Sequence, residues 1–94
     1  KDFYTASLYI KLDELKSANI YYYSIVNNYY DTKFVNDALF NIALLNIIEG
    51  KNPVLFLKNH KNSFLSNEDY LNTLLLIEDL DINHDEDYYI NLLR

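Results

Sequence analysis

Cysteine, tryptophan and methionine are absent from this 94-residue chain, and glycine and proline occur once each, as Gly50 and Pro53. Without cysteine, the chain has no disulfide, no thiolate ligand for a metal and no sulfur nucleophile. A β-sheet protein with many tight turns needs several glycine and proline residues, whereas both residues disfavour helices. Because half of the residues are apolar, the composition predicts an all-α fold around one hydrophobic core.

Long apolar runs are also missing. The uninterrupted runs reach about four residues, for example residues 54–57 and 74–77, whereas a membrane-spanning helix needs about 20. We therefore expect no membrane span in this chain. No signal-peptide pattern follows Lys1, so a targeting segment or a lipid anchor is expected only outside these residues. The length indicates a single domain over residues 1–94.

Positive charge is scarce in the last third of the chain. Residues 1–65 contain seven lysines and six acidic residues, whereas residues 66–94 contain eight acidic residues and one basic residue, Arg94. An acidic surface repels phosphate backbones and anionic lipid headgroups. We therefore expect no nucleic-acid partner, and we interpret the acidic residues either as a solubilising surface or as a match for a basic protein.

The apolar residues repeat with helical spacing. Leu15, Ala18, Tyr22, Ile25 and Tyr29 follow one another at steps of three and four residues, which predicts an amphipathic helix. A helix over about residues 2–12 precedes it so closely that the two must be antiparallel neighbours. The whole pattern predicts about six helices in three hairpins, over about residues 2–30, 33–65 and 67–93. The helix that opens the second hairpin is apolar on most sides, which indicates that it lies between neighbours.

Short polar residues mark where several of these helices begin and end. Thr32 is a candidate N-cap for the helix that follows it. Gly50 suits a left-handed cap, and Asn52 with Pro53 is typical of a helix start. Capping boxes are predicted at residues 66–69 and 83–86.

No residue pattern indicates an enzyme or a metal centre. The chain has no glycine-rich phosphate loop and no recognisable nucleophile with its base. Alternating polar residues from Asp79 to Asp87 resemble the start of a calcium-binding loop, but His84 stands where that loop needs glycine and Ile90 where it needs glutamate. The other histidine, His60, is interpreted as a packed structural residue. We therefore expect a protein that is not an enzyme and uses no cofactor or metal.

Small residues and an aromatic turn recur in the first two hairpins. Ala6, Ala18 and Ala43 stand where closely packed helices need a small side chain, and Ala43 follows Ala6 by 37 residues. The turn Asn-Tyr-Tyr-Asp-Thr at residues 28–32 precedes a helix with Ala-Leu-Phe-Asn-Ile-Ala at residues 38–43. Over about residues 3–59 the chain therefore resembles the tetratricopeptide repeats of the BamD family, the lipoprotein subunit of the outer-membrane β-barrel assembly machinery. Tyr30 stands where that family has proline.

The resemblance implies a tetratricopeptide-like α-solenoid that binds proteins. For a BamD-like protein, the implied partners are a BamA-type barrel-assembly protein or unfolded outer-membrane proteins. The implied location is the periplasmic face of the bacterial outer membrane. The CpoB (YbgF) family of periplasmic coordinators has nearly the same repeat pattern, and a cytosolic repeat adaptor is a third possibility.

Repeat proteins bind their partners on a concave face lined by the first helix of each hairpin. Carried onto this sequence, the repeat positions give a set of candidate partner-binding residues: Phe3, Ser7, Ile10 and Lys11 from the first hairpin, and Asp37, Phe40, Leu44 and Ile47 from the second. We expect these side chains to form apolar pockets for an extended or helical segment of a partner.

Overall fold

The computed structural model describes residues 2–94, among which there are six α-helices and no strand. Lys1, with which the predicted domain begins, lies outside the described residues. The predicted all-α fold is confirmed. The helices are α1 (Asp2–Lys11), α2 (Leu15–Asn28), α3 (Phe34–Ile48), α4 (Pro53–Asn59), α5 (Asn67–Glu78) and α6 (Glu86–Ile90), with a short 3-10 helix η1 (Lys61–Ser63) after α4.

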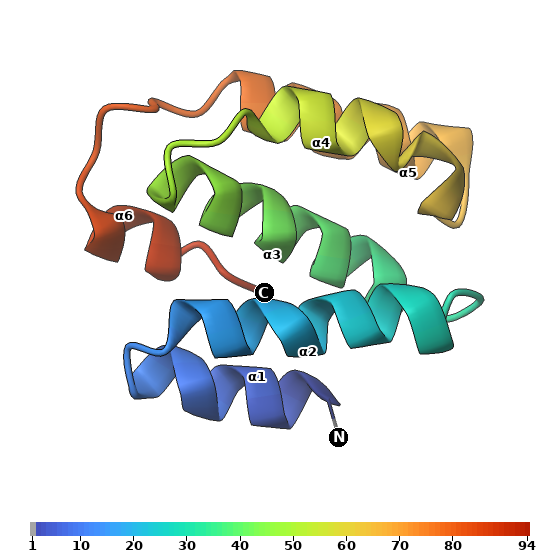
Figure 1. The fold of residues 1–94 in the computed structure, drawn as a ribbon. Coiled ribbons are helices and arrows are strands. Elements are labelled where there is room, and N and C mark those ends of the chain that lie inside the picture. The colour runs from blue at the N-terminus through green and yellow to red at the C-terminus, as the bar shows by residue number, and fades with distance from the viewer. Residues whose placement is uncertain (1) are drawn as a thin grey trace.

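The first hairpin consists of α1 and α2, which lie side by side in Figure 1. Ala6 and Ala18 are fully buried, as expected where small side chains let two helix backbones approach each other closely. The rings of Tyr9 and Tyr21 stack with their centroids 5.5 Å apart. In the turn, Asp13 has a φ of 58°, a left-handed conformation that aspartate tolerates better than most residues.

The centre of the fold is α3. It packs against α2, α4, α5 and α6, and residues 38–46 are all buried. The sequence predicted this position, because a helix that is apolar on most sides must be covered by neighbours. With so little exposed surface, α3 fixes the placement of the elements packed on it.

The predicted capping residues are found at the end of α3 and at the starts of α4 and α5. Gly50 has a φ of 75° and closes α3. The side-chain oxygen of Asn52 accepts hydrogen bonds from two amides of the first turn of α4, at 3.0 and 3.1 Å, and Pro53 is the first residue of that helix. The hydroxyl of Ser66 accepts from the amide of Asp69 at 3.1 Å.

Two other predicted helix starts are wrong. The hydroxyl of Thr32 donates to the carbonyl of Tyr29 at 2.8 Å, so it does not cap α3, which begins two residues later without a side-chain cap. A threonine hydroxyl often bonds to a nearby carbonyl in a turn, and that local bond prevails here. The box predicted at residues 83–86 is displaced, because the cap of α6 is Asp85, whose carboxylate accepts from the amide of Tyr88 at 3.1 Å.

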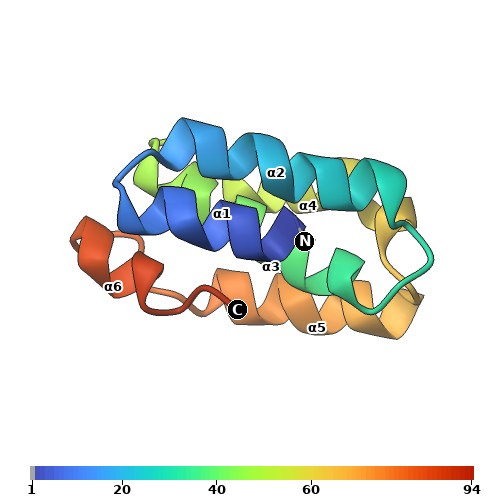
Figure 2. The same ribbon diagram turned by 90° about the horizontal axis from the view of Figure 1, so that it is seen from below.

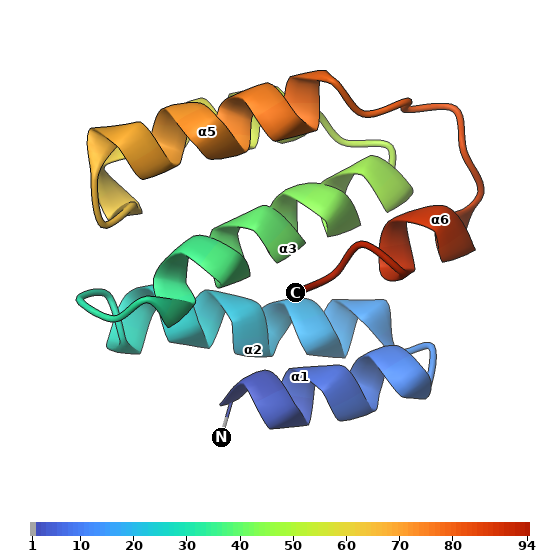
Figure 3. The same cartoon turned by 180° about the vertical axis from the view of Figure 1, so that it is seen from behind.

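The chain after α5 differs from the predicted third hairpin over residues 67–93. Residues 79–85 lead away from α5, and α6 packs against α3 (Figures 1 and 3). Tyr89 anchors α6 in this place. Its side chain is buried, and its hydroxyl donates to the carbonyl of Asp81 and accepts from the amide of His84. Because α3 is apolar on most sides, α6 covers apolar surface of α3 in this position.

One face of the molecule is formed by α1, α3 and α5 (Figure 3). Figure 3 looks onto this α1–α3–α5 face, and Figure 2 shows the C-terminal end lying between α1 and α5. The molecule is a slab with principal extents of 32 × 30 × 17 Å. Over residues 2–94, every helix falls short of the length and apolarity of a membrane-spanning segment.

Candidate partner-binding surface

Three of the four candidate residues of α1 border one cavity on the α1–α3–α5 face. Ser7, Ile10 and Lys11 line a cavity of about 260 Å³, which is also lined by Ile90, Leu93 and Arg94. Ile10 is half-buried, and Lys11 is exposed. The exposed hydroxyl of Ser7 donates to the carbonyl of Phe3 at 3.0 Å. Two polar side chains and one apolar side chain of α1 are therefore available at the edge of this face.

Phe3 is separate from that group. Its ring meets the edge of Tyr22 at a centroid distance of 6.0 Å and the tilted ring of Phe34 at 5.7 Å. These contacts place Phe3 among the aromatic residues that join α1 to α2 and to the start of α3. It also lines a smaller cavity of about 170 Å³ with Phe34.

The candidate residues of α3 are divided between the surface and the core. Leu44 has no exposed surface and Phe40 only 6%. The prediction that Leu44 contacts a partner is wrong in this structure, because α3 is surrounded and Leu44 belongs to its core. Asp37 is half-exposed, and Ile47 lines a different cleft at the far end of α3.

Residues 88–94, which we call the C-terminal segment, lie on this face. Tyr89 is buried, and the half-buried Leu92 and Leu93 pack against the core. The amides of Leu92 and Leu93 donate to the carbonyls of Tyr89 and Ile90, at 3.0 and 3.2 Å, so the chain leaves α6 through a turn before it reaches Arg94. Part of the surface predicted to bind a partner is therefore covered by the protein's own chain.

Asn41 holds the end of the C-terminal segment. Its side-chain amide donates to the carbonyl of Arg94 at 3.1 Å, and its side-chain oxygen accepts from the Arg94 amide at 3.0 Å. Asn41 has no exposed surface, and its side chain also bonds to that of Tyr22. A buried carboxamide is costly unless it is paired, and here it pairs with both backbone groups of one residue.

The guanidinium of Arg94 continues this contact. It lies over the ring of Phe40, 4.1 Å from the ring centroid, and 3.6 Å from the carboxylate of Asp37. A cation over an aromatic face is favourable, and a neighbouring carboxylate adds to the attraction. Both partners were among the predicted binding residues, but their contact with Arg94 was not predicted.

Asn41 and Arg94 were not among the predicted binding residues. Asn41 is the one polar residue within the run from Ala38 to Leu45, and Arg94 is the one arginine of the chain. A single side-chain carboxamide in an otherwise apolar run indicates a specific contact, because such a group needs a hydrogen-bonding partner when it is buried. The identity of that partner depends on where α6 packs, which residue spacing does not reveal.

Burial and neighbouring charges perturb two ionisable groups near this face. Burial raises the pKa of the Tyr22 hydroxyl, and the hydrogen bond from Asn41 partly offsets that rise. Glu86 is an exposed residue at the start of α6, and its pKa is raised by partial desolvation and by the negative charge of Asp13, whose side chain shares a hydrogen bond with it. Two carboxyl groups thus repel each other where α6 meets the turn between α1 and α2.

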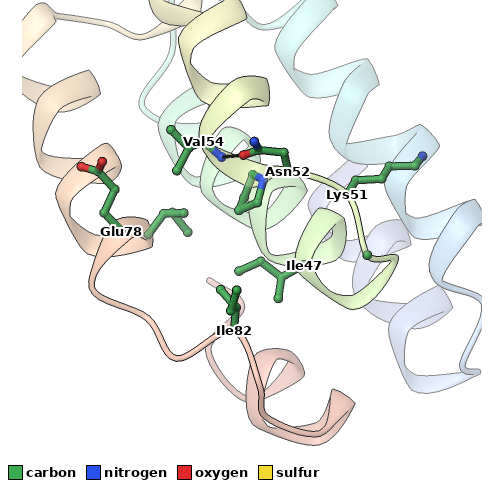
Figure 4. Close-up of a pocket in the computed structure, with 9 residues that line it drawn as sticks. Ile47, Lys51, Asn52, Val54, Glu78 and Ile82 are labelled. Carbon is green, nitrogen blue, oxygen red and sulfur yellow. Dashed lines mark hydrogen bonds between the residues drawn. The ribbon is translucent and has the colours of Figure 1, made fainter.

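A second cleft, of about 570 Å³, lies between the end of α3, the start of α4 and the end of α5 (Figure 4). Ile47, Val54 and Ile82 supply apolar surface, and Lys51 and Glu78 lie at its sides. The hydrogen bond drawn in the figure is the one that Asn52 forms as the cap of α4. Sequence reasoning did not single out this cleft, because its walls come from three separate segments.

The two histidines lie in aromatic contacts. His60 stacks on Phe56 at a centroid distance of 4.3 Å, and its Nδ1 lies 2.9 Å from the Phe56 carbonyl. His84 stacks on Tyr88 at 3.9 Å. Within residues 2–94, no three histidine, cysteine, aspartate or glutamate side chains gather in a group that could hold a metal ion.

Comparisons of this chain with protein-family models, with curated proteins and with solved structures find no match.

Proposed function

We propose that this protein is a non-catalytic helical scaffold that binds a segment of another protein on its α1–α3–α5 face. The observation that supports this function is that a peptide segment already lies there. The C-terminal segment rests on α3, with both backbone groups of Arg94 paired to Asn41. A surface that binds a peptide of its own chain has the groups needed to bind one from elsewhere.

The chemistry of this face is that of recognition. Ile10 and Phe40 provide apolar contact, Asn41 pairs with main-chain groups, and Asp37 provides a negative charge. Interfaces of this kind gain their affinity from a few buried anchors surrounded by polar groups.

A finer proposal follows from the resemblance in the sequence alone. We propose a BamD-like role in assembling outer-membrane β-barrel proteins, at the periplasmic face of the outer membrane. Its support is the repeat pattern of Ala6, Ala18 and Ala43 with the turn at residues 28–32. The partner would then be a BamA-type barrel-assembly protein or an unfolded outer-membrane protein.

The test is co-purification from the bacterial envelope with a tagged full-length protein. The double variant Ser7→Glu/Lys11→Glu changes two exposed side chains on the edge of the face, so the fold should persist and circular dichroism should be unchanged. We expect recovery of the BamA-type protein to fall at least fivefold. Lys58→Glu, a charge reversal at an exposed position of α4, is the control away from this face and should have no effect.

The two parts of the proposal fail in different ways. If recovery of the barrel-assembly protein is the same for the parent and the double variant, binding on this face is refuted. If no barrel-assembly protein is recovered with any form, and the same variants alter the capture of a cytosolic protein, the envelope role is refuted and the scaffold function is retained.

A further inference from the structure

We propose that the C-terminal segment is a built-in competitor, and that the partner it imitates presents an arginine preceded by two leucine-sized residues. This inference rests on the proposed function and names the class of partner. Asn41 would recognise the backbone of the partner's arginine, and Asp37 with Phe40 would recognise its side chain.

The contact with Asn41 does not depend on the side chain of the bound residue. A carboxamide that donates to a carbonyl and accepts from the amide of the same residue recognises only the peptide main chain. Because Asn41 has no exposed surface beneath the segment, its two bonds are shielded from competing water. This pair of bonds would fix the register of an incoming peptide.

The neighbouring groups select the side chain. The Arg94 guanidinium is held by the face of Phe40 at 4.1 Å and by the carboxylate of Asp37 at 3.6 Å. The cavity of about 370 Å³ that Asp37 and Arg94 line is also lined by Asp69 and Lys33, so these two further charges offset each other and the contacts with Phe40 and Asp37 carry the selectivity. A flat cation that can stack on a ring and bond to a carboxylate fits better than the point charge of a lysine.

The segment that now occupies the site buries few of its side chains. The helix α6 spans only Glu86–Ile90, and the connection before it is exposed over residues 81–85. Of the C-terminal segment, Tyr89 alone is buried, while Leu92 and Leu93 are half-buried. The carboxyl groups of Asp13 and Glu86 repel each other where α6 contacts the first hairpin. An element with few buried contacts opens at a lower free-energy cost than the core.

Competition of this kind has a measurable consequence. A ligand that needs the open site binds with an apparent affinity reduced by the fraction of molecules in which the site is open. Weakening the bound segment without altering the pocket should therefore strengthen binding of a separate peptide.

The test measures binding of a fluorescein-labelled peptide, with the sequence of residues 86–94 and an amidated C-terminus, to the full chain by fluorescence anisotropy. Arg94→Ala removes the side chain of the built-in competitor and leaves the pocket intact. We expect the peptide to bind this variant about fivefold more tightly than the parent. Lys58→Ala removes a positive charge from α4 and should leave affinity unchanged.

Two further measurements test the recognition of arginine. A peptide whose final arginine is replaced by alanine should bind the Arg94→Ala chain about fivefold more weakly than the original peptide. Adding Asp37→Asn to the Arg94→Ala chain should remove most of that difference, as a double-mutant cycle requires for two interacting groups.

The proposal is overturned if the parent and the Arg94→Ala chain bind the peptide equally, or if the two peptides bind equally. Equal binding of both peptides, with NMR shifts in α1 and α3, would leave the proposed function intact. A dimeric parent that Arg94→Ala converts to a monomer would assign the site to exchange of segments between copies, and would also overturn the inference.

Discussion

Replacing Asn41 with alanine should loosen the C-terminal segment before it affects the rest of the fold. The change removes the two hydrogen bonds to Arg94, at 3.0 and 3.1 Å. A hydrogen bond contributes about 1 kcal/mol net, so the pair gives about 2 kcal/mol. At about 1.4 kcal/mol per factor of ten, this loss raises the population of the detached segment about 30-fold.

Hydrogen exchange measured by NMR tests this magnitude at individual amides. The amides of Leu92 and Leu93 donate to carbonyls within the segment, so they report on its detachment in both proteins, whereas the Arg94 amide loses its acceptor in the variant. We expect the Leu92 and Leu93 amides to exchange about 30-fold faster in Asn41→Ala than in the parent.

The matched control is Asn46→Ala, which removes another buried asparagine further along α3. This variant should leave exchange within the C-terminal segment nearly unchanged. An acceleration below threefold in Asn41→Ala, or an equal acceleration in Asn46→Ala, would refute the view that Asn41 holds the segment through specific bonds.

Three further predictions concern the rest of the molecule. Gly50→Ala should lower the free energy of unfolding in urea by about 1 kcal/mol, because Gly50 has a φ of 75°; an unchanged midpoint would contradict it. Leu44→Ala should cost about 2–5 kcal/mol in the same assay, because Leu44 is fully buried, and a loss below 1 kcal/mol would argue against a core position. The raised pKa of Glu86 means that this group stabilises the fold below about pH 4.5 and that the contribution is lost as the pH rises through the folded-state pKa. Glu86→Gln should therefore be more stable than the parent at pH 7 but not at pH 3; a gain that is equal at both pH values would contradict the repulsion from Asp13.

Features that depend on neighbouring residues in the sequence were predictable. Gly50, Asn52 and Ser66 act through their own backbone or through amides two or three residues away, so their roles follow from local chemistry. The burial of Ala6 and Ala18 followed from helical spacing. Thr32 shows the limit of this reasoning. Its hydroxyl could accept from an amide of the next helix or donate to the carbonyl of Tyr29, and in the structure it donates to Tyr29.

Features that depend on the packing of α6 were not predictable from spacing. The predicted third hairpin over residues 67–93 included a terminal helix, but residue spacing does not determine which neighbour that helix covers. Because α6 packs on α3 and not on α5, the chain that follows it covers Phe40 and brings Arg94 to Asn41. The repeat rule placed the candidate surface on α1 and α3, while the segment that lies on this surface and the bonds of Asn41 to it emerged only from the tertiary structure.

The central position of α3 has a consequence for how the protein unfolds. Long repeat arrays lose their terminal repeats first, since each repeat depends only on its neighbours. Here α2, α4, α5 and α6 all pack on the same helix, so losing either hairpin exposes the apolar surface that the other needs. We expect the helical body to melt in a single cooperative transition, preceded only by detachment of the C-terminal segment. The protein would then combine one indivisible folding unit with one terminal segment that detaches independently, so that the surface beneath this segment can be exposed without any loss of the helices that form it.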